Sequence, residues 1–151
     1  MNKILWIDSD GIFIQPFIRR LEYNNYDVTH VSDILKAEQL IRQKKRWDIL
    51  IIDIIMHVAE AAERKGYLPS ETSGGYYTGS IFLERNWDYI KKQNMPILIF
   101  TILSEEDINI TNDFVNYKVY VRDKLGCSTV DFLNLVNDLF KKRNIDNEQD
   151  R

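Results

Sequence analysis

The sequence contains a single cysteine, Cys127, among 151 residues. One cysteine excludes an internal disulfide and is typical of proteins that work in a reducing compartment. The apolar stretch near the start of the chain ends at Ile7, which makes it too short for a signal peptide or a membrane span. These absences lead us to expect a cytoplasmic protein with no membrane contact.

Charge of either sign is also not concentrated, because the net charge is only −3 and acids and bases are scattered along the chain. Binding to nucleic acid normally needs a clustered basic face. The densest basic run, Arg42–Arg46, ends a helical pattern, where cations complement the helix dipole. We therefore expect no nucleic-acid partner.

Short apolar runs, unbroken rather than alternating, predict strands that are covered on both faces, as in a parallel sheet. The four runs are Lys3–Ile7, Ile49–Ile52, Ile97–Phe100 and the weaker Lys118–Val121. A fifth segment, Tyr26–Val31, alternates and predicts a half-exposed strand. Helical patterns lie between the strands, the last of them from Thr129 to Lys142 with Ser128 as its cap. This order predicts βαβ units in one doubly wound α/β domain.

Three segments depart from that rhythm. Residues 57–78 are too long for a simple connection, and loops of this length are usually functional or mobile. Residues 104–117 are polar and only weakly helical in pattern. Residues 143–151 contain one apolar residue, so we expect a disordered tail after a domain of residues 1–142.

Two of the predicted buried strands end in acids, which places Asp8, Asp10 and Asp53 near one edge of the sheet. Carboxylates about 4 Å apart repel each other by about 4 kcal/mol at an effective dielectric of about 20. Such a cluster needs a cation, a shared proton or wider spacing, and oxygen ligands suit Mg²⁺. The alternative is structural: Asp10 caps the first helix and Asp8 faces solvent.

The remaining two strands add a hydroxyl and an ammonium to the same edge, since Thr101 ends the fourth strand and Lys124 follows the fifth. These are groups that stabilise a transferring phosphoryl group. Thr101 alone is weak evidence, because threonine is common at strand ends for packing reasons. The informative feature is the order of acid, acid, hydroxyl and lysine along the chain.

This ordered set resembles the receiver domain of bacterial two-component response regulators, over nearly the whole chain up to about Lys142. The segments that carry the resemblance are Lys3–Asp8 for the first strand, Trp47–Met56 for the phosphoacceptor strand, Thr78-Gly79 for the turn into the third helix, Met95–Thr101 for the fourth strand, and the residues Tyr120 and Lys124. The resemblance implies a flavodoxin-like, five-stranded parallel sheet of order 2-1-3-4-5 with helices on both faces.

The resemblance also implies a function and assigns residues to it. Asp53 would accept a phosphoryl group from a sensor histidine kinase or a phosphotransfer protein, with Thr101 and Lys124 assisting. Mg²⁺ would be held by Asp8, Asp53 and the backbone carbonyl of Ile55, and Thr101 and Tyr120 would form the switch.

It further implies a phosphorelay signalling protein rather than an enzyme. The sequence shows no output domain after Lys142, so signalling would pass to a separate output protein. A homodimer would form through the face of the fourth helix, fifth strand and fifth helix.

Several residues depart from the family pattern. Ser9 stands where receivers carry a second acidic Mg²⁺ ligand, so metal binding would be weak unless Asp10 substitutes. Ile102 stands where a small residue usually leaves room for the phosphoryl group, and the lysine segment is one residue out of register. Apolar Ile55 and Leu103 would slow hydrolysis of an acyl phosphate.

The 57–78 insertion has two interpretations. It lies over the acceptor site and contributes an acid from Glu60, Glu63 or Glu71, or it is a surface elaboration for partner binding or merely tolerated length.

Two other functions stay open at this point. A pseudo-receiver would keep the fold as an interaction module without phosphotransfer, as the altered positions Ser9 and Ile102 suggest. The segment Asp8–Phe13 also resembles the signature of haloacid dehalogenase-type phosphatases, with Asp8 as nucleophile and Asp10 as general acid/base. That alternative lacks the late acidic pair of the family and leaves Asp53 without a role.

Overall fold

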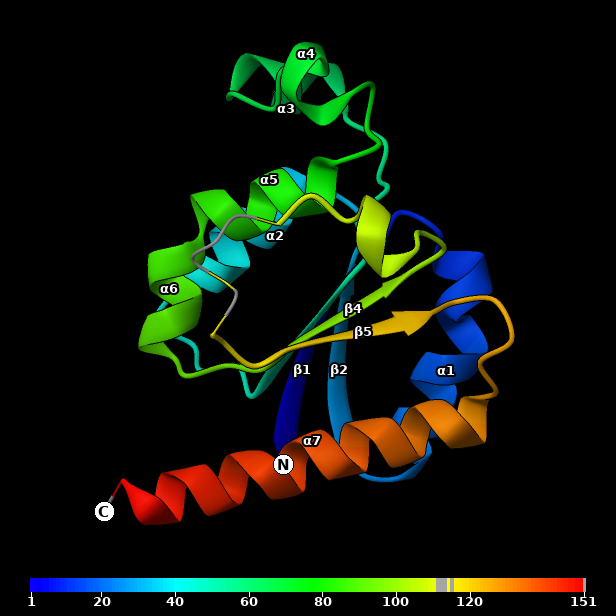
Figure 1. Ribbon diagram of the computed structural model, residues 1–151, viewed down its shortest axis with the longest axis vertical. Coiled ribbons are helices and arrows are strands. Elements are labelled where there is room, and N and C mark those ends of the chain that lie inside the picture. Colours follow the sequence, from blue (N-terminus) through cyan, green and yellow to red (C-terminus); the bar gives the residue numbers. More distant parts are fainter. Residues whose placement is uncertain (111–113, 115, 151) are drawn as a thin grey trace.

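The computed structural model describes residues 1–110, 114 and 116–150, and it contains one five-stranded parallel sheet in the order β2-β1-β3-β4-β5 (Figure 1). The strands are β1 (Asn2–Ile7), β2 (Tyr26–Val31), β3 (Ile49–Ile52), β4 (Ile97–Thr101) and β5 (Val119–Asp123). The expected fold class and strand order are therefore confirmed. The strand positions match the apolar runs because those runs had to be covered on both faces.

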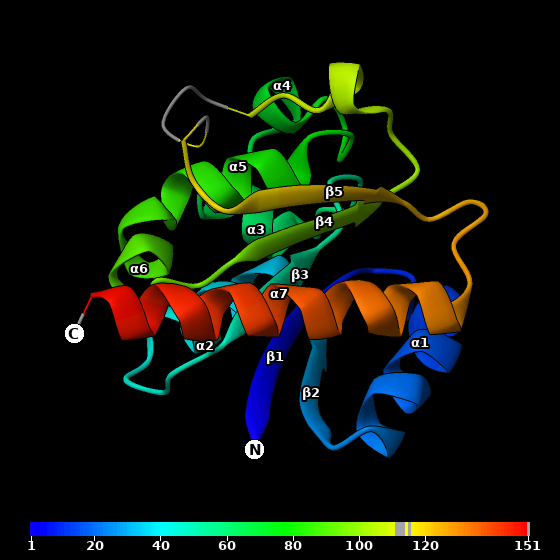
Figure 2. The same ribbon diagram turned by 60° about the horizontal axis from the view of Figure 1, so that its bottom comes forward.

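Helices cover both faces of this sheet, as two views show (Figures 1 and 2). The helices are α1 (Gly11–Tyr23), α2 (Ile34–Arg42), α3 (Glu60–Arg64), α4 (Pro69–Thr72), α5 (Thr78–Arg85), α6 (Trp87–Lys92) and α7 (Thr129–Gln149). Helices α1 and α7 pack together on one face, while α2, α5 and α6 lie on the other. Along the described residues, none of these helices combines the length and apolar character that a membrane-spanning helix needs.

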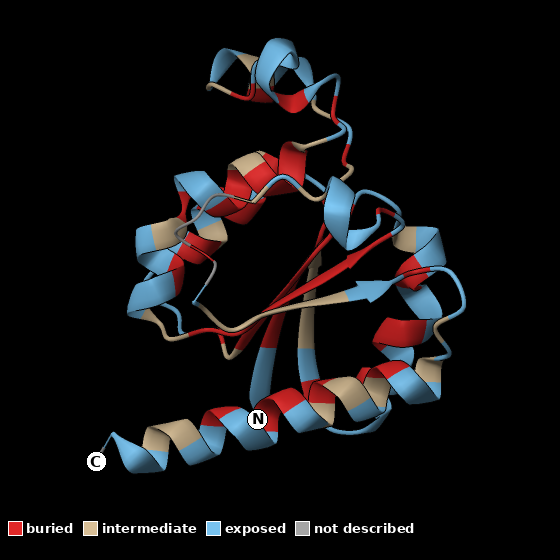
Figure 3. Cartoon of the chain, viewed as in Figure 1, coloured by how far each residue is buried: buried red, intermediate tan, exposed pale blue. Residues whose placement is uncertain are grey.

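The sheet separates two apolar clusters, and the central strands are buried throughout (Figure 3). The cluster beneath α1 and α7 is aromatic: Trp6 stacks on Phe132 at 5.1 Å, and Phe100 meets Phe132 at 4.7 Å. The opposite cluster is mainly aliphatic. Truncation of a buried aromatic residue of this kind costs about 3–5 kcal/mol, so this cluster fixes α7 firmly to the sheet.

Helix α7 is longer than the sequence predicted, and the expected disorder from residue 143 is wrong as far as Gln149. Arg143 is only 4% exposed and its guanidinium pairs with the carboxylate of Asp48, which lies just before β3. Farther along the helix, Lys118 Nζ lies 2.9 Å from Asp146 Oδ2. The polar residues after Lys142 are helical because Arg143 and Asp146 pair with charged side chains in the rest of the domain.

The insertion forms a separate projection, the insertion lobe (residues 57–77), which carries α3 and α4 above α5 (Figure 1). Its base is closed, since Met56 N donates to Gly75 O at 3.0 Å. Gly75 has φ +104° and a Cβ there would lie 2.6 Å from Met56 O, so this closure needs glycine. The lobe is thus an ordered pair of short helices.

A buried carboxylate fastens the insertion lobe to the body. Glu38 on α2 accepts hydrogen bonds from Tyr67 Oη at 2.7 Å and Arg85 Nε at 3.0 Å. Asn86 Nδ2 adds a third at 3.1 Å, and the Arg85 guanidinium lies over the Tyr67 ring. A charge that is removed from water needs this degree of pairing, so the lobe, α2 and the α5–α6 junction are joined by one polar network.

Between β4 and β5 the described residues contain only a 3-10 helix, η1 (Glu105–Asp107), in place of the expected fourth α-helix. Residues 111–113 and 115, which also fell within the weak helical prediction, lie outside the described residues. The proposed dimer face of fourth helix, fifth strand and fifth helix therefore lacks that α-helix in the described segment. The acidic and polar composition of 104–107 offers no apolar stripe to hold a longer helix against the sheet.

Candidate functional site

The carboxyl ends of β1, β3 and β5 bring two acids and a lysine together. The register pairs Ile7 with Ile52, so the residues that follow, Asp8 and Asp53, lie side by side at one edge of the sheet. The ammonium of Lys124 lies 2.7 Å from Asp53 Oδ2 and 2.7 Å from Asp8 Oδ2. In this acid–lysine cluster the Lys124 ammonium stands between the two carboxylates, so it offsets the repulsion that the sequence predicted.

All three side chains are withdrawn from water: Asp8 is 0% exposed, and Asp53 and Lys124 are each 6% exposed. Burial raises the pKa of Asp8 in spite of the Lys124 ammonium beside it. Burial alone would lower the pKa of Lys124, but its contacts with Asp53 and Asp8 outweigh that effect and the pKa is raised. The lysine is therefore firmly protonated and places a cation between the two carboxyl groups.

The backbone around Asp53 is held from two sides. Asp53 N donates to Ile7 O at 3.0 Å, and Asp53 Oδ1 accepts from Ile55 N at 3.3 Å. On the opposite side Gly79, near the start of α5, donates its N–H to Ile54 O at 2.9 Å. A Cβ on Gly79 would lie 2.2 Å from Asp53 O, so the absence of a side chain lets α5 pack directly against the end of β3.

Asp10 is not part of the cluster. Its Oδ1 accepts from Phe13 N at 3.1 Å and caps α1, while its own N–H donates to Asp8 Oδ1 at 2.8 Å. The structural alternative was therefore right for Asp10 and wrong for Asp8, which is buried. Ser9 is exposed, and within the described residues no group of three His, Cys, Asp or Glu side chains is arranged to hold a metal ion.

Thr101 lies at the same edge and is fully buried, and its carbonyl accepts from Lys124 N at 2.9 Å. Tyr120 lies elsewhere. It packs against the aromatic cluster, with the Lys142 ammonium 5.2 Å from its ring centroid. Since side chains alternate along a strand, it is Val121 that faces the Thr101 side, so the expected Thr101–Tyr120 pair is not formed.

The two apolar positions that follow Thr101 differ from each other. Ile102 is 55% exposed, so its side chain lies mostly in solvent rather than filling the space beside Asp53. Leu103 is buried, and its N–H donates to Thr101 Oγ1 at 3.4 Å. Ile55 is half-buried against the aliphatic cluster.

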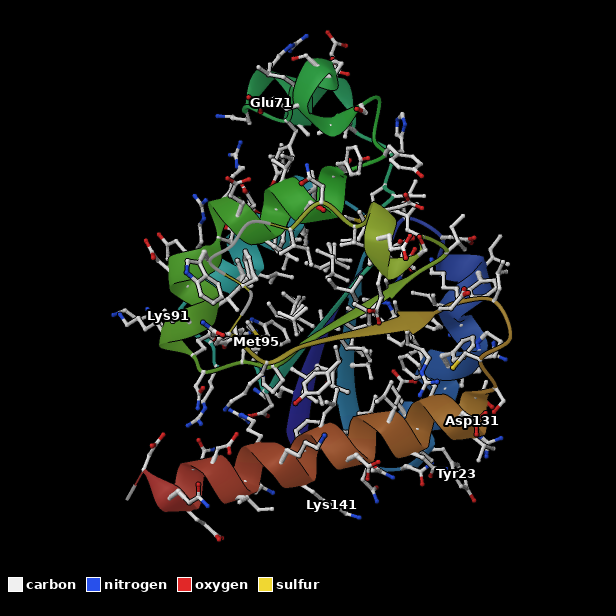
Figure 4. The ribbon with its side chains drawn as sticks, viewed as in Figure 1. Tyr23, Glu71, Lys91, Met95, Asp131 and Lys141 are labelled. Atoms are coloured by element: carbon white, nitrogen blue, oxygen red, sulfur yellow. The ribbon has the colours of Figure 1, made fainter. Side chains whose placement is uncertain are left out.

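The insertion lobe borders the acidic edge through its first residues. A cavity of about 300 Å³ lies between Ser9, the start of α2 and the first residues of the lobe, where His57, Ala59, Ala61 and Ala62 line it. Two of the three acids of the insertion lobe do not point toward the acidic edge. Glu60 pairs with the exposed Arg64, and Glu71 lies on α4 in the outer part of the lobe (Figure 4).

Solved structures place this arrangement in a known fold. A receiver domain protein from Methanospirillum hungatei has a TM-score of 0.67 and 15% identity, covering 97% of this chain and 98% of that one. The receiver domain of a Francisella response regulator has a TM-score of 0.61 and 23% identity, covering 94% and 98%. A receiver domain protein from Clostridium thermocellum has a TM-score of 0.66 and 18% identity, covering 96% and 98%.

The chain is thus a doubly wound α/β protein with the fold of response regulator receiver domains over nearly its full length. No protein-family model and no curated protein matches the sequence. The similarity is one of fold, and the residues at the acidic edge must carry the argument about function.

Two supporting residues were missed by sequence reasoning. Gly79 was seen only as part of a turn, although a glycine at the start of a helix that faces a strand end is a signal of close backbone approach. Glu38 gave no signal, because a single acid in an amphipathic helix is usually solvated.

Proposed function

We propose that this protein is a receiver that accepts a phosphoryl group on Asp53 and signals through contacts with other proteins. The observation that carries the proposal is the Lys124 ammonium, 2.7 Å from carboxylate oxygens of both Asp53 and Asp8. Burial of such an ion pair costs free energy, and the pair is kept where its geometry is excellent or where it has a functional role. A carboxylate nucleophile beside a fixed ammonium is suited to phosphoryl transfer.

In the proposed reaction an Asp53 Oδ attacks the phosphorus of a phosphohistidine. The new P–O bond forms as the P–N bond breaks, and the imidazole leaves with its electron pair and takes up a proton. Lys124 would then shift from the carboxylate toward the equatorial phosphoryl oxygens, where negative charge is concentrated. The Thr101 hydroxyl at the same edge supplies a second donor.

The oxygen atoms at this edge fit a hard cation. Asp8 Oδ2 is fully buried and makes no hydrogen bond within the described residues, although the Lys124 ammonium is beside it. Asp8, Asp53 and the Ile55 carbonyl would hold Mg²⁺, which commonly uses one or two carboxylates and keeps several waters. The ion would neutralise charge on the phosphoryl group. With Asp10 committed to capping α1, we expect weak Mg²⁺ affinity.

The surface around the cluster favours a protein as phosphodonor. Four large apolar side chains are exposed at this edge, in the first turn of α1 and in the segments after β4 and β5: Ile12 (92%), Phe13 (37%), Ile102 (55%) and Leu125 (66%). Exposed apolar side chains that gather on one face are typical of a protein interaction site. We propose a sensor histidine kinase or phosphotransfer protein of the cytoplasm as donor, and a separate output protein as recipient of the signal.

The test is phosphorylation by acetyl phosphate and by a histidine phosphotransfer protein, each with Mg²⁺, followed by intact-mass measurement. We expect a gain of one phosphoryl group that is lost in Asp53→Asn and retained in Asp27→Asn, a matched change on exposed β2. The Ile55→Asn variant should shorten the lifetime of the acyl phosphate. Steady turnover that depends on Asp8 would instead indicate the phosphatase.

One observation favours the pseudo-receiver as second candidate. The acid that could replace the missing ligand at Ser9 is Asp10, and its carboxylate caps a helix. If neither donor modifies the protein, and Mg²⁺ does not change the fluorescence of the buried Trp6 in β1, the interaction module is the better description.

A further inference from the structure

A second hollow lies at the other end of the sheet, far along β3 from Asp53. It is a cavity of about 560 Å³. One wall is formed by residues 41–46 at the end of α2 and just after it, and the other by Tyr89, Lys92, Gln93 and Asn94 in α6 and just after it. In Figure 4 the labelled Lys91 and Met95 mark this end of the molecule. The volume is within the range of about 300–1,000 Å³ that is typical of small-molecule sites.

The lining of this basic cavity is strongly one-sided in charge. Of its ten residues five are cationic and none is acidic. The five are Arg42, Lys44, Lys45, Arg46 and Lys92. Among the described residues, only Arg42 of these has an ion-pair partner, which is Glu38. In a chain with net charge −3, the cations gathered here repel one another and attract a polyanion.

Hydrogen bonds also hold the two walls of the cavity together. Gln93 ties its two walls together: its Oε1 accepts from Trp47 N at 2.9 Å and its Nε2 donates to Ile41 O at 3.2 Å. Arg42 is fixed by the bond from its Nε to Asn86 Oδ1 at 2.8 Å, and its guanidinium lies 5.2 Å from the Tyr89 ring centroid. The junction of the two walls and the Arg42 guanidinium are therefore held in place before any ligand arrives.

We infer that this basic cavity binds a small, multiply phosphorylated ligand. Lysine ammonium groups act as point charges for phosphate, and a fixed arginine adds directed donors. Enclosure by two walls favours a compact anion over a nucleic-acid backbone, which needs an extended basic stripe. The half-exposed Tyr89 ring offers a stacking surface that would distinguish a nucleotide from inorganic phosphate. This site does not depend on phosphorylation of Asp53.

The test is isothermal titration of the full chain, in the presence of a metal chelator, with adenosine triphosphate and with inorganic tripolyphosphate. The triple variant Lys44→Gln, Lys45→Gln, Lys92→Gln should raise Kd at least about tenfold, and added salt should weaken binding. The matched control is Lys36→Gln, Lys65→Gln, Lys141→Gln, which removes the same charge from exposed sites elsewhere. It should change Kd less than about twofold.

Amide chemical shifts locate the ligand, and they should move in residues 42–46 and 89–94. A Tyr89→Leu variant that loses affinity for the nucleotide alone identifies a nucleotide ligand, while equal loss or none identifies the phosphate chain as the recognised group. Absence of saturable binding, or an equal loss of affinity in the two triple variants, would overturn the inference. Chemical-shift changes confined to the acid–lysine cluster, or tighter binding of a short oligonucleotide, would do the same.

Discussion

Gly79 and Asp53 meet backbone to backbone: a methyl group added to Gly79 would lie 2.2 Å from the carbonyl oxygen of Asp53. Helix α5 therefore approaches the end of β3 as closely as a polypeptide can. The position of the Asp53 carboxylate is set by this contact together with the hydrogen bond from Asp53 N to Ile7 O.

Gly79→Ala should destabilise the protein by about 1–3 kcal/mol, because overpacking forces the backbone of Asp53 to move. The sign is informative, since the same change inside an ordinary helix stabilises by about 1 kcal/mol. Urea unfolding measures the effect, and the rate of Asp53 phosphorylation should fall with it. The neighbouring Ser80→Ala, whose hydroxyl has no partner in the described residues, is the control and should be near neutral. An unchanged or raised stability in Gly79→Ala would contradict the contact.

Lys124→Met should lower the free energy of unfolding by about 2–4 kcal/mol at neutral pH, because it leaves two buried carboxylates without their cation. The loss should shrink as the pH is lowered toward the raised pKa of Asp8, since protonation of that acid relieves the repulsion. Unfolding of both proteins at two pH values measures this. The control is Lys118→Met, which removes the partner of Asp146. Lys118 is more exposed than Lys124, so this change should cost about 1 kcal/mol or less. A loss that is independent of pH would count against the coupled cluster.

Arg143→Met should destabilise by about 1–3 kcal/mol, because it leaves the largely buried Asp48 carboxylate without its partner. The double variant with Asp48→Asn should recover part of the loss. Exposed Lys141 on the same helix (Figure 4) supplies the control Lys141→Met. If truncation after residue 142 has no effect on thermal unfolding, the last turns of α7 do not contribute to the fold.

Stability should fall between pH 10 and pH 12. Burial raises the pKa of Tyr117 from 10.0 to about 12, so its contribution is complete below pH 10 and is lost above it. The raised pKa of Lys124 acts in the same direction at higher pH. Tyr117→Phe should flatten the decline, whereas Tyr23→Phe, at an 88% exposed residue, should leave it unchanged. Parallel declines in all three proteins would contradict this assignment.

The strands could be predicted because a buried parallel strand must be apolar at every position, as β3 is. The same argument placed Asp8 and Asp53 at one edge, since their strands end there. Lys124 could be placed at the same edge because it follows the fifth predicted strand, but its contact with both acids depends on the path of the chain after β5.

The errors arose where tertiary partners decide local structure. The residues after Lys142 are polar, but the pairing of Arg143 with an acid 95 positions away keeps them helical. Tyr120 was chosen for its aromatic character, whereas strand alternation gives the Thr101 face to Val121. A one-residue shift reverses the face that a side chain occupies, and the sequence alone does not fix it.

The hydrogen bond that joins Met56 to Gly75 closes the base of the insertion lobe, so the sheet does not fix the length of the chain beyond it. Because the closing entropy of a loop grows only slowly with its length, residues can be added at exposed positions of the lobe at small cost, as long as Tyr67 keeps its contact with Glu38. Strand β3 and α5 would not change. The exposed residues 73–74 are thus a natural insertion point, where a reporter or a foreign binding segment could be carried without disturbing the acidic edge.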